Sequence, residues 1–551
     1  MDKKKATLAI YGIQDRINTD TPFYVHDHGL TLMNQGKVIK HLSLERLSRR
    51  KHDNTLHEQI YELLKSERLL RSDDYDLVFV DNVVGRAFIS SCGRFRFEAP
   101  LNQNLLAQAE LGRCWWLDKE KEAYAINHEL AHIASCLPFY GAYKENSLLV
   151  HFDGGGSLSN FSAWQFRNNQ LCCIEFHWDL KYLSALFNAN ALVFGIIGAK
   201  YKEQNSVPGK MMGLAAFGTY RHELEDWLKK HNYFTNLWAS KKAFIDAAQK
   251  DFGWQQAQLN ERDFFLQDLI ATMQGIFQRD FLTKLSRLQD KEDYSNLYYS
   301  GGSALNIVTN KAIIDSQLFD NVYIPPCPDD SGLSLGAAAH LEWQKHGQIH
   351  LHNPYLNNWQ LASTDDVVIS ELELDKCAQA LLANKVVAVC NGTGEIGPRA
   401  LGNRSILSLA NSTELAKKVS MEHKRREWYR PVAPIMLDKN AVYFTGKKLV
   451  HRLAQYMLLD FEIEKNKQTE LQGAVHVDGT ARIQVIENRG QNPFMFALLT
   501  LLDNKYGIKA LINTSFNVRG EPIVQTKEDA INSAKNMNLD GLVINGYYQS
   551  L

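Results

Sequence analysis

The pattern of apolar and polar residues predicts strands at intervals along the whole chain. Residues 6–13 form a short apolar run typical of a first strand. Alternating patterns over residues 24–33 and 37–44 flank Asn34-Gln35-Gly36 and predict a β-hairpin. Further buried strands are predicted at residues 76–81, 147–152, 296–300, 385–390 and 510–512.

Helical periodicity alternates with these strands. An amphipathic helix is predicted over 55–70, a long helix over 264–288 and a small-residue helix over 333–339. A strand that runs into a glycine turn and then a helix occurs twice, near residues 153 and 301. This recurrence predicts an α/β fold with a duplicated unit, in which ligands collect at the carboxyl ends of the strands.

A change of composition divides the chain. Residues 346–366 are rich in His, Asn and Gln and lack clear periodicity, which indicates a linker. We therefore expect a first domain at 1–350, a linker at 351–368 and a second domain at 369–551.

Global composition excludes several classes of protein. The 551 residues suffice for two to four domains, and a net charge of -1 gives no overall field for nucleic acid or an anionic membrane. Eight cysteines without a Cys-x-x-Cys motif fit a reducing compartment. The short apolar run after the basic N-terminus and the lack of any stretch near ~20 apolar residues predict a cytoplasmic protein without a membrane span.

The segment 127–157 contains the densest candidate chemistry. His128 and His132 lie one helical turn apart, where two imidazoles can share a metal ion. After the buried strand, Asp153 offers a carboxylate, and the glycine turn Gly154, Gly155 and Gly156 allows backbone amides to approach a phosphate. The alternative is that the histidines cap a core helix; the adjacent Asp-Gly-Gly-Gly turn favours a metal-and-phosphate site.

Three further segments carry weaker signals. The loop 208–218 could bring Lys210 and Gly213 close to a ligand, but a glycine-rich packing turn explains it equally well. Asp330 is either a helix N-cap, which is favoured when it is taken alone, or a metal ligand. The basic run 46–53 is most simply a solvated surface.

The C-terminal part gathers cations locally. Residues 399–430 contain eight Lys or Arg and three Glu, and residues 424–430 mix cations with aromatics. Nucleic-acid binding is one interpretation, but the cluster lacks an extended basic stripe. A compact phosphate pocket fits better, because guanidinium groups bind phosphate through paired hydrogen bonds. The loop 513–522 adds hydroxyl, amide and guanidinium donors.

These strings together resemble the O-carbamoyltransferase family of the nodulation, cephamycin and tobramycin type. The similarity covers nearly the whole chain, and the matching strings stand in the family's order. They lie at residues 127–132, 208–213, 395–405, 426–431, 478–482 and 513–517.

The resemblance implies an N-terminal lobe with the actin and sugar-kinase ATPase fold and a C-terminal YrdC-like lobe. It also implies that carbamoyl phosphate and ATP, with Mg²⁺, form a carbamoyl adenylate in the second lobe. The first lobe would then pass the carbamoyl group to a hydroxyl of a natural product or sugar, beside an iron-type or other divalent metal. We expect no nucleic-acid or membrane partner, and a homodimer as the assembly.

The resemblance assigns roles to residues in four groups. His26 and Lys51 fall near the acceptor, where His26 is our candidate base. His128, His132, Asp153 and Asp330 fall at the metal. The expected nucleotide site comprises Gly154, Gly155, Gly156, Lys210, Gly213, Gly301, Gly302 and Asn306. The expected carbamoyl phosphate and phosphate ligands are Arg399, Arg404, Lys424, Arg430, Arg482, Ser515 and Asn517.

One departure from the family bears on the acceptor. A polar insertion at residues 14–23 separates the first strand from His26-Asp27-His28-Gly29, where the family runs directly into His-Asp-Ser-Ala. The sequence also leaves other functions open: tRNA threonylcarbamoylation, disfavoured by the lack of a basic stripe; a nucleotide-sensing regulator without catalysis; and a sugar kinase, which would leave the C-terminal basic pocket without a role.

Overall fold

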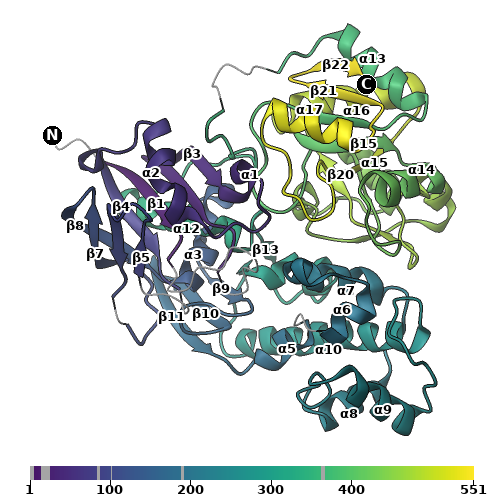
Figure 1. Ribbon diagram of the computed structural model, residues 1–551, viewed down its shortest axis with the longest axis horizontal. Coiled ribbons are helices and arrows are strands. Elements are labelled where there is room, and N and C mark those ends of the chain that lie inside the picture. Colours follow the sequence, from purple (N-terminus) through teal and green to yellow (C-terminus); the bar gives the residue numbers. More distant parts are fainter. Residues whose placement is uncertain (1–4, 14–24, 83–86, 101, 188–190, 362–366) are drawn as a thin grey trace.

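A computed structural model describes residues 5–13, 25–82, 87–100, 102–187, 191–361 and 367–551 (Figure 1). The chain folds into an N-terminal lobe containing two sheets and a C-terminal lobe built on a third. The polar insertion at 14–23 lies outside the described residues.

Eight strands form the first sheet, in the order β3-β2-β1-β4-β8-β7-β6-β5. β1, β2 and β3 form an antiparallel meander, β4 runs parallel to β1, and β8 runs parallel to β4. The predicted hairpin is confirmed, with Gly36 at φ 75° in the turn between β2 and β3. The strands are β1 (Ala6–Tyr11), β2 (Gly29–Asn34), β3 (Lys37–Ser43), β4 (Tyr75–Val80), β5 (Ala87–Ile89), β6 (Phe95–Glu98), β7 (Glu110–Trp116) and β8 (Lys119–Ile126).

The second sheet repeats this topology in the order β11-β10-β9-β12-β13. β9, β10 and β11 form an antiparallel meander, and β12 and β13 continue the sheet in parallel with β9. Two copies of a meander followed by parallel strands confirm the predicted duplicated fold of the actin and sugar-kinase type. The strands are β9 (Ser147–Phe152), β10 (Phe161–Arg167), β11 (Gln170–His177), β12 (Asn296–Ser300) and β13 (Asn321–Tyr323).

Two helices pack against each other and join these sheets. α12 contacts β1, β2 and β4 of the first sheet, whereas α3 contacts β9 and β12 of the second. Gly336 of α12 allows the close approach, because a Cβ at this position would lie 1.8 Å from the carbonyl oxygen of Ala131 in α3. The small-residue helix predicted at 333–339 therefore exists and extends to His346.

α8 and α9 project at the lower edge of Figure 1. The long helix predicted at 264–288 is confirmed as α10. The helices are α1 (Leu44–Ser48), α2 (Leu56–Ser66), α3 (His128–Ala134), α4 (Leu137–Tyr140), α5 (Lys181–Leu186), α6 (Ala191–Ile197), α7 (Val207–Ala215), α8 (His222–Lys230), α9 (Lys241–Phe252), α10 (Phe264–Gln289), α11 (Ile307–Asp315) and α12 (Leu333–His346).

The C-terminal lobe is built on a mixed sheet in the order β19-β16-β20-β15-β14-β21-β22, with helices packed around it (Figure 1). Its strands are β14 (Val387–Cys390), β15 (Arg404–Leu409), β16 (Ala433–Leu437), β19 (Gln484–Ile486), β20 (Ala510–Ser515), β21 (Gly541–Ile544) and β22 (Tyr547–Ser550), beside a ribbon of β17 (Phe461–Glu462) and β18 (Thr480–Ala481). Its helices are α13 (Glu371–Leu382), α14 (Thr413–Lys417), α15 (Asp438–Thr445), α16 (Pro493–Tyr506) and α17 (Lys527–Asn536).

The segment predicted as a linker is packed between the lobes where the structure describes it. Trp359 is fully buried, and Asn357 forms single β-bridges with His41 of the first lobe and Gly394 of the second. Residues 362–366 lie outside the described part of the chain. The expected domain limits remain predictions.

Candidate functional site

The two predicted histidines lie on the short helix α3, directly beneath the end of β9. Asn127 caps this helix, with its side-chain oxygen accepting a hydrogen bond from Leu130 N–H at 2.8 Å. The Nε2 atoms of His128 and His132 are 2.9 Å apart, and both side chains are buried. Two donors bound to one ion at about 2.1 Å and at a right angle would be separated by this distance.

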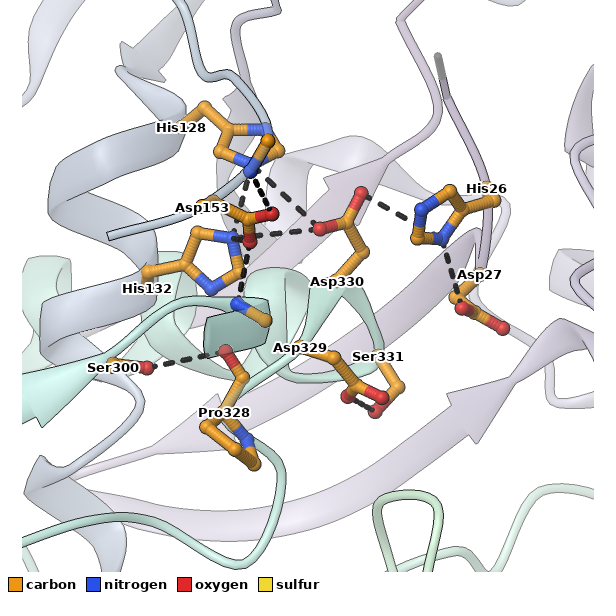
Figure 2. Close-up of polar contacts among 12 residues, drawn as sticks. His26, Asp27, His128, His132, Asp153, Ser300, Pro328, Asp329, Asp330 and Ser331 are labelled. Atoms are coloured by element: carbon orange, nitrogen blue, oxygen red, sulfur yellow. Dashed lines mark hydrogen bonds and ion pairs between the residues drawn. The ribbon is translucent and has the colours of Figure 1, made fainter. Parts of the chain in front are cut away.

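Two carboxylates complete the group, and Figure 2 shows all four side chains directed at one another. His132 Nε2 lies 3.5 Å from Asp153 Oδ2 and 3.4 Å from Asp330 Oδ1, and His128 Nε2 lies 3.7 Å from Asp330 Oδ1. The structure thus brings together all four residues predicted to bind metal. The side chain of Asp330 caps neither of the helical segments that begin here, so the capping alternative is wrong.

The protonation of this group depends on the balance between burial and charge. Burial lowers the pKa of His128 to about 4, whereas Asp330 and Asp153 outweigh burial and raise the pKa of His132. Burial alone would raise the pKa of Asp330, but His26 and His128 hold it well below its usual range. Buried imidazole and carboxylate groups that face one another fit a divalent cation, which binds these groups in their deprotonated forms.

His151, which the sequence interpretation missed, belongs to the same group. One candidate ligand atom from each of His128, His132, His151 and Asp153 lies within 4.8 Å of the others. The signal was present in the strand periodicity: His151 and Asp153 are two residues apart, so they share one face of β9 and its extension.

The second oxygen of Asp330 connects the metal group to the predicted acceptor residues. Asp330 Oδ2 accepts a hydrogen bond from Tyr11 at 2.7 Å. The same oxygen lies 3.8 Å from His26 Nδ1 (Figure 2). Asp27 Oδ2 contacts His26 Nδ1 at 2.9 Å and His52 Nδ1 at 3.0 Å. Burial opposes protonation of His26, but Asp330 and Asp27 raise its pKa to about 10.

Lys51 lies close to this group but is held by a carboxylate. Its Nζ contacts Glu45 Oε1 at 3.0 Å and Oε2 at 2.8 Å. The same carboxylate accepts a hydrogen bond from His52 N–H at 3.0 Å. Glu45 therefore fixes the turn that presents both Lys51 and His52.

The glycine turns shape the end of the second sheet. Gly154 N–H and Gly302 N–H both donate to the carboxylate of Asp153. Gly301 has φ 104°, and a Cβ there would lie 2.3 Å from Phe152 O. These contacts orient Asp153 and explain the glycines without a nucleotide.

Four other residues predicted at the nucleotide site also have protein partners. A Cβ on Gly156 would lie 2.6 Å from the buried Glu129 side chain, and Gly155 packs against Trp178. Asn306 caps α11 by accepting from Thr309 N–H. Lys210 is buried, with Nζ 2.9 Å from Glu203 and 2.7 Å from Glu427.

A cavity of about 310 Å³ lies between the two lobes. The first lobe contributes small and apolar residues of α7 and α10, including Gly213. The second lobe contributes four arginines and Ser515. The arginines are Arg399, Arg426, Arg430 and Arg482, of which Arg426 was not among the predicted ligands.

The arginines repel one another in a site largely withdrawn from water. Burial and then Arg430 lower the pKa of Arg399 to about 10, and burial with neighbouring guanidinium groups lowers the pKa values of Arg426 and Arg482. The Nε atoms of Arg399 and Arg482 are buried and have no hydrogen-bond partner among the described residues. Such a cluster fits a ligand with several negative charges.

Three predicted phosphate ligands do not line this cavity. Arg404 donates from its guanidinium group to the backbone carbonyls of residues 391, 392, 403 and 525, which uses all five of its N–H donors. Lys424 Nζ is buried and donates to oxygens of Ser515 and Asn517. Arg404 and Lys424 therefore stabilise the loops beside the cavity. The sequence alone does not show which cations line the cavity and which support its loops.

The metal group and the cavity are joined by adjoining loops. A Cβ on Gly397 would lie 2.3 Å from Pro326 O, so the loop leading to Arg399 packs on the loop leading to Asp330. Arg46 Nη2 donates to Gly397 O at 2.9 Å. Asp329, next to Asp330, acts on Arg399 electrostatically.

No helix in the described part of the chain is both long and apolar enough to cross a bilayer. Family models described as carbamoyltransferase N-terminus and carbamoyltransferase C-terminus match residues 86–339 and 378–550.

Three named relatives are similar over most of their length. Nodulation protein NolO of Bradyrhizobium diazoefficiens is 30% identical over 76% of this chain and 78% of its own. Nodulation protein NolNO of Sinorhizobium fredii is 25% identical over 95% and 79%. The 3'-hydroxymethylcephem-O-carbamoyltransferase of Streptomyces clavuligerus is 27% identical over 77% and 80%.

Proposed function

The chain belongs to the carbamoyltransferase family, and on that premise we propose that it uses carbamoyl phosphate and ATP to carbamoylate a hydroxyl of a small-molecule natural product or sugar. The observation that carries this proposal is the cavity between the lobes, with its four arginines. Paired guanidinium hydrogen bonds suit the phosphates of both co-substrates.

Activation would take place in this cavity. Water cleaves the phosphoryl group from carbamoyl phosphate, giving carbamate and inorganic phosphate. A carbamate oxygen attacks the α-phosphorus of ATP, the bond to the bridging oxygen breaks, and pyrophosphate leaves with the Mg²⁺ that accompanied ATP. Arg399, Arg430 and Arg482 would stabilise the negative charge that develops on the phosphate oxygens.

Transfer would take place at the metal group. The acceptor oxygen attacks the carbamoyl carbon, and the bond to the AMP oxygen breaks. The hydroxyl proton would pass to Nε2 of the neutral form of His26, while Nδ1 contacts Asp27. A cation held by Asp330 would favour this neutral form, because it would offset the negative charge that raises the pKa of His26. Lys51, oriented by Glu45, would contribute positive charge near the acceptor. The two facing lobes would keep water away from the carbamoyl adenylate, which is a reactive mixed anhydride.

The metal ligands proposed are His128, His132, Asp153 and Asp330. A divalent cation such as Fe(II), when bound, supplies a Lewis acid for the oxygen that gains charge during transfer. The chain's own residues hold this position: Asn127 caps the histidine helix, Tyr11 fixes Asp330, and Gly302 N–H fixes Asp153.

The same proposal assigns transfer to residues 1–350 and activation to 369–551. The AMP released by transfer would contact the glycine turns at 154–156 and 301–302. A cytoplasmic, homodimeric enzyme is consistent with this chemistry.

Product analysis tests the proposal. Purified protein is incubated with ATP, Mg²⁺ and carbamoyl phosphate, and nucleotides and phosphates are quantified by mass spectrometry and ³¹P NMR. We expect AMP and pyrophosphate to form only when carbamoyl phosphate is present. The rate of their formation should fall at least 100-fold in Arg482→Ala, because one removed electrostatic contact typically costs about 2.7–4 kcal/mol. Arg489→Ala, an exposed arginine of the same lobe, is the matched control. ADP as the product, or equal turnover in both variants, would refute the proposal.

A further inference from the structure

His151 occupies an unusual position for a histidine, in the middle of the second sheet. It lies on β9, between Ser162 of β10 and Ser300 of β12, and its side chain is fully buried. Its Nδ1 lies 3.2 Å from Ser162 Oγ, whereas its Nε2 is buried and has no hydrogen-bond partner in the part of the chain described. An unsatisfied buried polar atom costs about 1–3 kcal/mol, so an unused imidazole nitrogen calls for a partner.

The surroundings of His151 indicate what that partner is. Its ring stacks on His132, with 5.2 Å between centroids and 23° between planes, and lies 6.2 Å from the ring of His128. A ligand atom of His151 is within 4.8 Å of one from each of His128, His132 and Asp153. Two donors bound to one ion at 2.0–2.2 Å can be up to about 4.4 Å apart, so a shift of a few tenths of an ångström would suffice.

We propose that His151 is a further metal ligand, binding through Nε2, and that Ser162 is its positioning residue. This inference rests on the metal centre of the proposed function. The contact between Ser162 Oγ and His151 Nδ1 would keep the proton on Nδ1, which leaves the Nε2 lone pair for the metal. Ligand histidines in proteins are commonly oriented by such a contact to their second nitrogen.

A third imidazole changes which metal the site prefers. Three imidazoles with Asp153 and Asp330 favour Fe(II), Co(II), Ni(II) or Zn(II), whereas Mg²⁺ prefers oxygen ligands. The centre would therefore exclude the Mg²⁺ that enters with ATP. His151 would therefore let the metal centre reject Mg²⁺ even though the cavity proposed to bind ATP with Mg²⁺ adjoins it.

Cobalt binding to the intact chain tests the inference independently of activity. Metal-free wild type, His151→Leu, Ser162→Ala and the control His340→Leu are titrated with Co(II) against a chromophoric chelator, and visible absorption is recorded. His340 is also fully buried but lies on α12, outside the cluster. We expect one tight site in wild type and control, and an affinity at least 10-fold lower with altered absorption bands in His151→Leu. Ser162→Ala should weaken binding in the same direction, and an excess of Mg²⁺ should compete only in His151→Leu.

The outcomes separate two kinds of failure. Absence of Co(II) binding in folded wild type would overturn the metal centre itself, and with it this inference. Tight binding with an unchanged affinity and spectrum in His151→Leu would overturn the inference alone. X-ray absorption of the wild-type cobalt complex serves as a second measurement if His151→Leu does not fold: three imidazoles support the proposal, and two contradict it.

Discussion

At the scale of single residues, the site contains like charges held close together. Arg399, Arg430 and Arg482 line the same cavity, and burial together with neighbouring guanidinium groups lowers the pKa values of Arg399 and Arg482. Such an arrangement weakens the ligand-free fold and strengthens anion binding, because a bound anion removes the repulsion. The stability of the free protein and its response to anions should therefore change in opposite directions when one arginine is removed.

This reasoning predicts the thermal behaviour of Arg482→Ala. Its melting temperature without ligand should equal or exceed that of wild type by a few degrees, and stabilisation by millimolar pyrophosphate should largely disappear. Differential scanning fluorimetry with and without pyrophosphate measures both quantities, with Arg489→Ala as the exposed control. A variant that melts earlier and keeps the wild-type response would indicate a structural role for Arg482.

At the scale of elements, the metal group depends on how closely α3 and α12 approach each other. The histidines lie on α3, and Asp330 lies just before α12. Gly336 leaves no room for a side chain at their crossing. The distance between these two helices therefore sets the distance between the imidazole and carboxylate ligands.

Gly336→Ala should lower both stability and metal affinity. Overpacking at a helix crossing costs about 1–3 kcal/mol, and moving α3 away from Asp330 should weaken Co(II) binding several-fold. Urea unfolding and cobalt titration measure the two effects. Gly209→Ala on α7, where a Cβ meets no atom within 4 Å, controls for the unfolding measurement. Lost stability with unchanged cobalt affinity would show that the crossing does not set the ligand spacing.

The predictability of these elements differs for physical reasons. Strand runs such as 147–152 and the helix at 264–288 were predicted because burial imposes a regular period on the sequence. His151 was missed because its two-residue spacing from Asp153 indicates a shared ligand only once the strand is known to end beside the histidine helix. Arg404 and Arg426 look equivalent in sequence, and only the tertiary fold directs one to backbone carbonyls and the other to the cavity.

At the scale of the whole molecule, a buried ion-pair network joins the lobes beside the cavity. Lys210 and Glu203 of the first lobe meet Glu427 and Arg519 of the second. Burial alone would raise the pKa of Glu203, but Arg519 and Lys210 lower it to about 2. The stabilisation from this carboxylate is complete above pH 4.5 and is lost as the pH falls toward 2.

Glu203→Gln should therefore destabilise the protein in a pH-dependent way. We expect a loss of about 2 kcal/mol in the free energy of unfolding at pH 7, and a smaller difference from wild type at pH 3, where wild-type Glu203 is losing this contribution. Guanidinium denaturation at the two pH values measures the difference. An equal difference at both values would contradict the role assigned to the Glu203 charge.

The central claim is that activation takes place in the arginine-lined cavity and transfer at the metal group. Exchange of labelled pyrophosphate into ATP in the presence of carbamoyl phosphate tests this claim most directly. This exchange requires formation of the adenylate but no acceptor. We predict exchange in wild type and in His128→Ala, and its loss in Arg482→Ala. Exchange that survives in Arg482→Ala but disappears in His128→Ala would place activation at the metal group and contradict the account.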